Sequence, residues 1–596
     1  MRSLELRVRR QLVEALLFEK LVPSEQTSGA DGRVRFRLRL GELALIATGR
    51  ISAFGRVRLE EDSIRHLQAD GHEAPVDLMA LVQALPGEVS VREALASELA
   101  QTINLCDWNR THLNREQSRR RLDHEALEGA IDEGHLYHPC FKARLGFTLD
   151  DHQAYGPEAA NGFQLHWLAV RRSQLRASLP LLEEDFWLCE VGPKTWDQLC
   201  TQLHAQGGEL HDYGVIPLHP WQWQHLQQQA LQLALARGDL LYLGAAGDQY
   251  AANQSLRTLR NLTRPHQAHV KLPLNVINTS AVRALASHSV CTAPAISRWL
   301  AKLVRADAYL KRSGLVILKE YAGTLYCPES PDEAQALAGQ VGAIWRESLQ
   351  SHLRAGEQAV PLTALMVTEA DGKPFIDGWV NRFGVSAWVA RLIEVAVLPV
   401  WHLLAQQGVA VEAHAQNMIL IHRDGWPERV ALRDFHESLE YVESYLARPE
   451  LKPDFARLNP LYRDAPDDHY YWMASIEALR ELVMDTLFVF NLAELSFLLE
   501  THYGWPEALF WQQVRQQLNQ HARAHKIAPE RWAALGIDAP KIRAESLLTK
   551  KLSRQPDQEF HHLIPNALAT SAQGLAQQDV LPNRLYSSIE CRSDLP

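Results

Sequence analysis

The sequence of 596 residues is 46% hydrophobic and 22% charged, the range of a globular protein with two to four domains. Its formal net charge of -10 gives no positive field to draw nucleic acid or anionic membranes, so neither is expected as a partner. The seven cysteines are scattered without a CxxC pair, which argues against a disulfide framework or a zinc ribbon and favours the reducing cytoplasm.

The first predicted domain covers residues 1–134. Its start interleaves arginine and glutamate with no long apolar stretch behind, which predicts an amphipathic helix to about residue 21 rather than a signal peptide. Apolar residues then alternate with arginine from Val34 to Leu40, predicting a strand that pairs with the next apolar run. Residues 75–134 return to helical periodicity and end at Gly134, where we place the domain boundary.

The second predicted domain, residues 135–340, mixes short apolar runs with helical periodicity, which indicates an α+β pattern. The predicted strands are residues 215–218, 240–244, 270–277 and 314–321, and the predicted helices are residues 221–237 and 295–304.

In the third predicted domain, residues 341–596, helices dominate and are interrupted by two predicted strands at 418–422 and 430–434. Two apolar stretches, 393–410 and 486–499, are interrupted by polar or charged residues, so both are expected to be core helices rather than membrane spans. With no repeat and no long linker, the domains are expected to pack together with the active site between them.

Familiar nucleotide and hydrolase motifs are missing from the sequence. It contains no GxxxxGK[ST] loop, no GxGxxG after a strand, no HExxH and no GxSxG. Any nucleotide must therefore be held by a less common arrangement of side chains.

Two segments near the start of the second domain are rich in chemically useful residues. His138, Lys142 and Arg144 could converge on an anion, although a solvated basic loop explains them as well. In the segment 215–222, Pro220 suits the first position of a helix, and a structural turn with a core tryptophan is the favoured interpretation.

Donor side chains gather in two further segments of this domain. Ser255, Arg257 and Thr258 offer hydroxyl and guanidinium donors within four residues. Lys271 and Arg283 bracket an apolar run at its two ends. This donor set suits a triphosphate, whereas a surface strand with flanking charges is the alternative interpretation.

Acidic residues follow in the third domain. Glu412 and Asp434, brought together by a hairpin-like return, would supply the hard oxygen ligands that Mg²⁺ takes beside phosphate oxygens. His414 would then lie near the charge being neutralised. As isolated residues they could equally be helix caps or turn formers.

Together and in this order, these segments resemble the IucA/IucC family of siderophore synthetases, which work without a nonribosomal peptide template. The resemblance runs from about residue 134 to 568 and includes a closing segment with Lys550, Lys551 and residues 564–568. It implies an α+β fold with three parts arranged as a cupped hand. These are a thumb (1–134), ATP-binding fingers (135–340) and a palm (341–596) with distant similarity to kinases.

The resemblance also implies an activity. Such an enzyme uses ATP and Mg²⁺ to adenylate a carboxylate of a small polycarboxylic acid, with citrate or a citryl derivative favoured. It then condenses the activated acid with an amine or alcohol and releases AMP and pyrophosphate. A cytoplasmic homodimer is expected on the same ground.

Site residues carry over position by position. Positions that hold ATP phosphates in the family match His138, Ser255, Arg257, Thr258, Lys271 and Arg283. Positions on the Mg²⁺ side match Glu412 and Asp434. Positions near the acid substrate match His414 and Arg283, and Lys271 is expected to act in catalysis together with His414 and Arg283. The chain departs from the family at Leu136, often a proline, and at residues 291–294, where Cys-Thr-Ala-Pro replaces a polar Arg-Asn-Gly-Pro stretch, so the acid's identity does not carry over.

Two other functions compete with this interpretation. A ferric-siderophore reductase would need four thiolate ligands for an iron-sulfur centre, but only Cys591 follows Cys327. A siderophore-binding or polycarboxylate-binding protein would explain the arginine and histidine clusters but not the paired acids. Nucleotide-dependent release of pyrophosphate would separate an enzyme from a binder.

Overall fold

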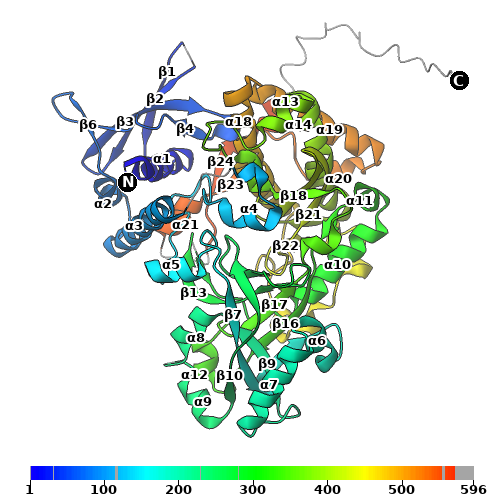
Figure 1. Cartoon of the computed structure of the whole chain (residues 1–596). Coiled ribbons are helices and arrows are strands. Elements are labelled where there is room, and N and C mark those ends of the chain that lie inside the picture. The colour runs from blue at the N-terminus through cyan, green and yellow to red at the C-terminus, as the bar shows by residue number, and fades with distance from the viewer. Residues whose placement is uncertain are drawn as a thin grey trace, which may run out of the picture.

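The computed structural model describes residues 2–30, 32–113, 118–228, 230–279, 281–553 and 558–570. Helices and strands are mixed throughout, which confirms the α+β class. Figure 1 shows an N-terminal sheet with its helices at the upper left, a larger sheet below, and the C-terminal helices at the upper right.

The N-terminal part is a six-stranded antiparallel sheet packed on helix α1 (Arg2–Phe18). Its second strand, β2 (Val34–Leu40), buries each apolar residue and exposes each arginine, as the alternation predicts. The other strands are β1 (Ser24–Ser28), β3 (Leu43–Ile51), β4 (Val57–Leu59), β5 (Arg65–Leu67) and β6 (Glu73–Pro75). Helices α2 (Leu78–Ala84), α3 (Val89–His112) and α4 (His124–Ala130) follow, in the region predicted as helical.

An eight-stranded antiparallel sheet forms the lower part, in the order β8-β16-β17-β12-β11-β10-β7-β9. Helices α6 (Glu183–Glu190) and α7 (Pro193–Ala205) cover one face, and α8 (Pro220–Leu226) and α9 (Gln232–Arg237) cover the other. Burial on both faces explains why apolar runs rather than alternation mark several of these strands. They are β7 (Phe163–Arg171), β8 (Leu175–Ser178), β9 (Tyr213–Leu218), β10 (Leu240–Ala252), β11 (Thr258–Asn261), β12 (His269–Lys271), β16 (Glu320–Tyr326) and β17 (Gly342–Arg346).

Three predicted elements in this part are each split in two. The expected strand 270–277 breaks at Pro273, which lacks an N–H for the ladder. Its second half, β13 (Leu274–Asn278), pairs with β14 (Ala281–Arg283) in a separate hairpin. The expected strand 314–321 divides into β15 (Val316–Ile317) and β16, which belong to different sheets, and the expected helix 221–237 divides into α8 and α9.

The C-terminal part contains a four-stranded sheet in the order β15-β21-β20-β18. Its hairpin of β20 (Met418–Arg423) and β21 (Trp426–Leu432) confirms the predicted return of the chain, and β18 (Gln358–Pro361) completes the sheet. Two short strands, β19 (Val409–Val411) and β22 (Leu439–Tyr441), precede and follow the hairpin in the sequence and pair with each other. The surrounding helices include α13 (Asp377–Phe383), α14 (Val385–Leu392), α15 (Leu398–His402), α17 (Ile476–Val483), α18 (Ala493–Tyr503), α19 (Glu507–Ala524) and α20 (Pro529–Ala534).

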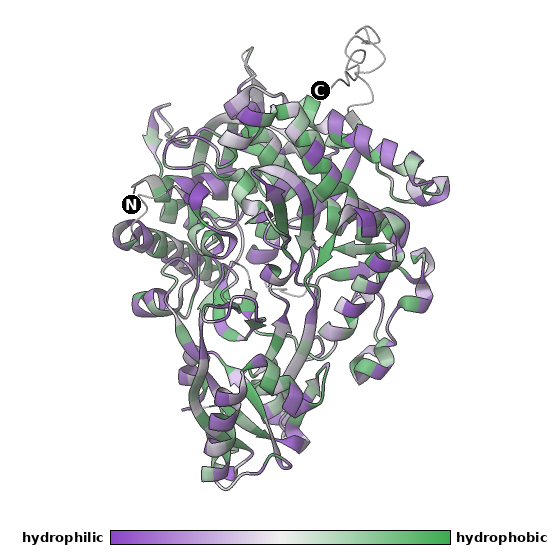
Figure 2. Cartoon of the chain, turned by 45° about the vertical axis from the view of Figure 1, so that its right-hand side comes forward, coloured by the Kyte–Doolittle hydropathy of each residue, from purple (hydrophilic) through white to green (hydrophobic). Residues whose placement is uncertain are grey.

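Two helical runs, Val385–Gln407 and Ile476–Tyr503, are long and apolar enough to cross a membrane by length and composition. In each, however, 78% of the most apolar window is buried inside the protein, as in a core helix. Both contain π-helical stretches. Figure 2 shows much of the green, apolar ribbon toward the middle of the molecule and purple, hydrophilic ribbon on its outer helices. The prediction of two core helices is confirmed.

The last described segment returns to the first helix. It comprises β23 (Lys541–Glu545), α21 (Leu547–Leu552) and β24 (His561–Pro565). The Glu19 carboxylate, just after α1, accepts hydrogen bonds from the backbone N–H groups of Leu548 and Thr549 at 2.8 and 2.7 Å and from the Tyr137 hydroxyl at 2.6 Å. The start of α21 is thereby fixed to the N-terminal part.

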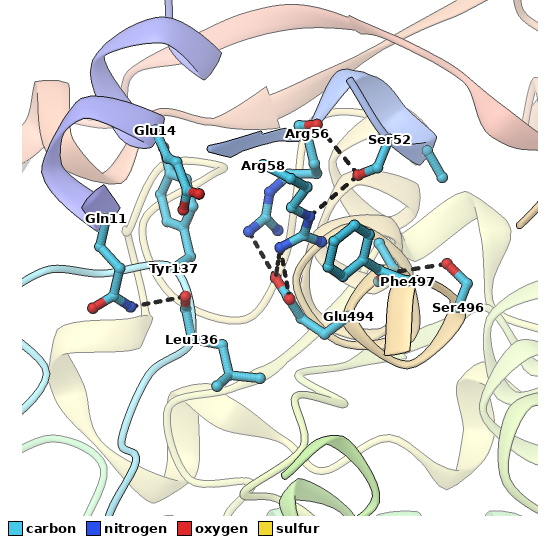
Figure 3. A network of polar contacts seen from close by, with 12 residues as sticks. Gln11, Glu14, Ser52, Arg56, Arg58, Leu136, Tyr137, Glu494, Ser496 and Phe497 are labelled. Carbon is cyan, nitrogen blue, oxygen red and sulfur yellow. Dashed lines mark hydrogen bonds and ion pairs between the residues drawn. The ribbon is translucent and has the colours of Figure 1, made fainter. Parts of the chain in front are cut away.

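A buried ion network joins the N-terminal sheet to α18 (Figure 3). Glu494 accepts from Arg56 at 2.8 Å and from Arg58 at 2.7 Å, and all three side chains are at least nine-tenths buried. Burial disfavours the charged carboxylate, but Arg58 and Arg56 outweigh it and hold the pKa of Glu494 below its ordinary value. The negative charge of Glu494 therefore compensates the positive charges of two buried arginines.

Replacing Glu494 with glutamine should lower the free energy of unfolding by roughly 1–3 kcal/mol, because an amide oxygen still accepts a hydrogen bond but neutralises neither arginine. Urea unfolding at neutral pH measures the loss. The matched control is Glu500→Gln. Glu500 lies on α18 as well and pairs with Arg50 of β3, but both of these side chains are about one-third exposed. That variant should lose less than about 1 kcal/mol. Equal losses in the two variants would contradict a special role for the buried network.

Candidate active site

A cavity of about 550 Å³ collects residues from all three parts of the chain. Its volume lies in the range of pockets that enclose a drug-sized ligand. The lining comes from α4 and the segment after it, from the turns and strands from the end of β10 to β14, from the end of β18, from the loops around β19 to β22, and from Lys550 of α21.

Seven of the predicted site residues line this cavity together. They are Ser255, Arg257, Lys271, Arg283, Glu412, His414 and Asp434. The other two, His138 and Thr258, are buried and are not among its lining residues.

The tight turn between β10 and β11 presents Ser255 and Arg257. The Ser255 hydroxyl donates to Asn253 Oδ1 at 2.7 Å and accepts from the Thr258 N–H at 3.1 Å, while Leu256 adopts a left-handed φ of 65°. Thr258 then pairs with Lys271 across β11 and β12, which puts both at the same level of the sheet. The turn and the strand pairing thus bring Ser255, Thr258 and Lys271 together in space.

Two arginines of the cavity have no carboxylate partner in the described residues. Arg257 donates to the carbonyl of Ala284, and Arg283 donates to the carbonyl of Asn278 at 2.8 Å. The Nε atom of each is buried without a hydrogen-bond partner in the described part of the chain. Burial, and then the nearby Arg257, lower the pKa of Arg283 to about 9. Such a pair of half-buried cations would be stabilised by a bound anion.

Lys271 lies beside a strongly held carboxylate. Its Nζ is 3.5 Å from Asp434 Oδ1, and Arg346 Nη1 is 2.8 Å from the same oxygen. Burial opposes ionisation of Asp434, but Arg346 and Lys271 outweigh it and hold the pKa of Asp434 well below its ordinary value. Burial lowers the pKa of Lys271, and Asp434 opposes that change. The lysine and the aspartate therefore stabilise each other's charged forms.

Sequence reasoning missed the groups that surround Lys271. His436 Nε2 lies 3.4 Å from Lys271 Nζ, and His436 Nδ1 lies 2.7 Å from Glu320. Glu320 and Arg346 face each other across β16 and β17, two strands with no local motif in the sequence. Only His436 and Glu437 had a sequence signal, because they stand two and three residues after Asp434.

The loop between β19 and β20 carries Glu412 and His414. His414 Nδ1 accepts the N–H of Gln416 at 3.1 Å, so a neutral His414 carries its proton on Nε2, which is 4.0 Å from Glu412. Within the described residues, no group of three or more His, Cys, Asp or Glu side chains could hold a metal ion alone. A Mg²⁺ ion that takes one or two carboxylates plus substrate phosphate oxygens needs no such group, and Glu412 and Asp434 fit that mode.

The basic segment before β7 has a different role from either one considered from sequence. Lys142 and Arg144 are fully buried, and both pair with the Glu158 carboxylate, at 2.5 and 2.7 Å. They are neither a solvated loop nor free to hold an anion. His138 Nδ1 accepts the N–H of Cys140 at 3.1 Å, and burial lowers the pKa of His138 well below its ordinary value.

Comparison with known proteins matches two family models. The IucA / IucC family matches residues 123–367, and the ferric iron reductase FhuF-like transporter family matches residues 386–560. A citryl-spermidine/3,4-dihydroxybenzoyl-citryl-spermidine:spermidine ligase of Bacillus anthracis is 33% identical over 98% of this chain and 97% of its own. An aerobactin synthase of Escherichia coli is 31% identical over 72% of this chain and 74% of its own.

Solved structures agree over nearly the whole chain. The petrobactin biosynthesis protein AsbB of Bacillus anthracis superposes with a TM-score of 0.90 at 33% identity, covering 97% of each chain. The aerobactin synthetase IucC of Klebsiella pneumoniae superposes with a TM-score of 0.81 at 26% identity, covering 96% of this chain and 98% of its own.

Proposed function

The chain belongs to the IucA/IucC family, and from this membership we propose that it is an ATP-dependent siderophore synthetase acting on citrate or a citryl derivative. A relative named as a citryl-spermidine ligase, matched over 98% of this chain, and one named as an aerobactin synthase, matched over 72%, support the siderophore class. The observation that carries the proposal is the cavity lined by Arg257, Lys271 and Arg283 together with Glu412 and Asp434. The cations suit phosphates and carboxylates, and the acids suit a divalent ion.

The chemistry proceeds in two steps. A carboxylate oxygen of the acid attacks the α-phosphorus of ATP, the bond from that phosphorus to the bridging oxygen breaks, and pyrophosphate leaves. The nitrogen of a neutral amine then attacks the acyl carbon, a C–N bond forms, and the C–O bond to AMP breaks. The nitrogen loses a proton in this second step, and AMP leaves as the phosphate anion.

The basic residues share one role in the first step. Negative charge shifts among the phosphate oxygens as pyrophosphate separates, and preorganised cations stabilise that transition state more strongly than they stabilise bound ATP. We assign Lys271, Arg257 and Arg283 to this task, with Arg283 also near the acid. His414 would donate its Nε2 proton to an acid oxygen, since its Nδ1 is already engaged. Ser255, Thr258 and His138 stay proposals for phosphate contacts.

Glu412 and Asp434 are proposed to hold Mg²⁺ together with phosphate oxygens. When bound there, the ion would neutralise phosphate charge as a Lewis acid. Asp434 has the further role of keeping Lys271 charged and in place, since the two side chains approach within 3.5 Å.

The purified protein with ATP, Mg²⁺ and citrate should form AMP and pyrophosphate, and faster once an amine acceptor is added. Coupled pyrophosphate release and nucleotide chromatography check this result, with other di- and tricarboxylic acids tested beside citrate. ADP and phosphate as products would overturn the adenylation mechanism.

The finer architecture is part of the same proposal. A cupped hand with a thumb (1–134), fingers (135–340) and a kinase-like palm (341–596) is consistent with a cavity lined from all three ranges. A cytoplasmic homodimer without membrane or nucleic-acid partners is proposed on family membership and charge.

The reductase alternative is favoured only by the match of residues 386–560 to the FhuF-like family. That range contains no cysteine, so it cannot supply the thiolates of an iron-sulfur centre. A siderophore-binding or polycarboxylate-binding protein would use the same arginines but would release no pyrophosphate, so the assay above also tests that alternative.

A further inference from the structure

The β13–β14 hairpin carries Arg283 and is held differently at its two ends. At its base, the N–H of Asn275 donates to Gln222 Oε1 at 2.9 Å, and the Asn275 side-chain amide donates to Gln340 Oε1 at 2.7 Å. At its tip, Thr279 adopts a left-handed φ of 63°, a conformation that is rare for a β-branched residue. Because surrounding contacts maintain such a conformation, the contacts at Thr279 matter for the shape of the hairpin.

Lys551 of α21 supplies one of these contacts. Its Nζ donates to the carbonyl oxygen of Thr279 at 3.0 Å and forms an ion pair with Glu98 Oε2 of α3 at 2.5 Å. The Lys551 and Glu98 side chains are only 9% and 8% exposed. One buried cation thus joins α3, α21 and the tip of the hairpin, and Figure 1 shows α21 beside α3.

The guanidinium of Arg283 is attached to the same tip. Its Nη2 donates to the carbonyl oxygen of Asn278 at 2.8 Å, and Asn278 directly precedes Thr279. Two consecutive carbonyl groups are thus each held by a cation, the first by Arg283 and the second by Lys551. Arg283 lines the cavity of about 550 Å³, which we call the main cavity, whereas Lys551 is not among its lining residues. A displacement of the tip would therefore carry Arg283 with it inside the main cavity.

We propose that Lys551 is a positioning residue for the ligase reaction, because it fixes the hairpin tip to which the Arg283 guanidinium is bound. The inference rests on the proposed function, in which Arg283 stabilises the charge of the reacting phosphate and lies near the acid. A misplacement of about 1 Å can slow a reaction by roughly 10²-fold, so a residue outside the cavity can control the rate. Glu98 lies in the N-terminal part and Lys551 in the last described segment, so the packing of both parts against the hairpin completes the site.

The burial of the Lys551–Glu98 pair decides which substitutions are informative. Lys551→Met removes the donor to the Thr279 carbonyl, but it also leaves the Glu98 carboxylate buried without its cation, which is costly in itself. The double variant Glu98→Gln/Lys551→Met removes both charges and still lacks the donor. Lys551→Arg keeps a positive charge and hydrogen-bond donors, so it should recover most of the activity that Lys551→Met loses.

The experiment is a double-mutant cycle that combines Lys551→Met with Arg283→Ala. Its readout is the citrate-dependent exchange of pyrophosphate into ATP, measured well below the melting temperature of each variant. In the otherwise wild-type protein, Lys551→Met should slow the exchange roughly 10-fold. In the Arg283→Ala protein it should slow the exchange further by less than about 2-fold, because the group that Lys551 positions is already gone.

Lys20 provides the matched control. It also donates to a backbone carbonyl, that of Leu563 at 3.4 Å, and it also has a left-handed φ, of 56°. Lys20 is exposed, however, and is not among the residues that line the main cavity. Lys20→Met should therefore leave the exchange unchanged in both backgrounds.

Equal slowing by Lys551→Met in the two backgrounds would overturn the inference, since Lys551 would then act independently of Arg283. A lowered melting temperature with an unchanged exchange rate would overturn it as well, because that pattern shows a purely structural role. If Lys551→Met does not fold, the Glu98→Gln/Lys551→Met variant takes its place in the cycle with the same expected outcomes.

Calorimetric titration with inorganic tripolyphosphate tests the same link without the reaction. Arg283→Ala and Lys551→Met should each weaken the binding of this anion several-fold, and the two changes together should weaken it little more than Arg283→Ala alone. If the wild-type protein shows no exchange, only the adenylation reaction fails, and the tripolyphosphate cycle decides the role of Lys551. Exchange by the wild-type protein with additive losses in the cycle would sink only the role of Lys551.

Discussion

Replacing Arg283 with alanine should lower turnover by roughly 10²- to 10³-fold, the usual cost of removing one preorganised donor from a developing charge. The half-buried guanidinium at the end of β14 lines the main cavity and makes no ion pair in the described residues. Citrate-dependent pyrophosphate exchange and steady-state turnover, measured on a preparation with an unchanged melting temperature, check the result.

The neighbouring residue supplies the control for this experiment. Val282 lies on the same strand with about half of its surface exposed, and Val282→Ala should keep full activity. Arg283→Lys should recover only part of the loss, because a point charge does not reproduce a planar donor pair. Normal turnover in a folded Arg283→Ala variant would restore the interpretation of this arginine as a flanking charge on a surface strand.

Asp434→Asn should weaken the apparent affinity for Mg²⁺ and ATP together by roughly 10- to 100-fold while the fold is kept. Asp434 has a φ of 63°, and asparagine tolerates this left-handed conformation as well as aspartate does. The amide oxygen can still accept from Arg346. Raising the Mg²⁺ concentration should restore part of the activity, which a Mg²⁺ titration at fixed ATP would show.

A second carboxylate of the same cavity makes the Asp434 experiment specific. Glu437 accepts the N–H of Ala286 at 3.1 Å and the Ser289 hydroxyl at 3.2 Å, so it is expected to hold that loop rather than the ion. Glu437→Gln should therefore lower the melting temperature more than it changes the Mg²⁺ requirement. The reverse pattern in the two variants would move the metal assignment from Asp434 to Glu437.

Elements whose determinants are local could be predicted from the sequence. The alternation in β2, the hairpin of β20 and β21, and the helix start at Pro220 each depend on neighbouring residues. The failures lie where the chain changes sheets. The expected strand 314–321 divides between two sheets: Leu318, just after β15, donates its N–H to Leu432 O, whereas β16 pairs with β17 and β8. No local pattern marks this switch, because the pairing partners of both halves lie far away in the sequence.

The candidate site divides in the same way. Glu412 and Asp434 belong to polar segments that were recognisable in order, and the structure brings both to one cavity. Glu320 and Arg346 were not recognisable, because their importance comes from facing each other across β16 and β17 beneath Lys271 and His436. Lys142 and Arg144 show the opposite error, since two basic residues close in sequence are neutralised by Glu158.

The attachment of α21 to Glu19 has a consequence for how the protein is made. Glu19 and Thr549 are separated by 530 residues, and Lys550 of the same helix completes the lining of the main cavity. During synthesis the N-terminal part can fold early, but this wall of the cavity is added only after the 530 residues between Glu19 and Thr549 have been made. A chain that stopped before α21 would carry Lys271 and Arg283 without it. Under the proposed function, such an unfinished chain is therefore expected to be a poor ligase.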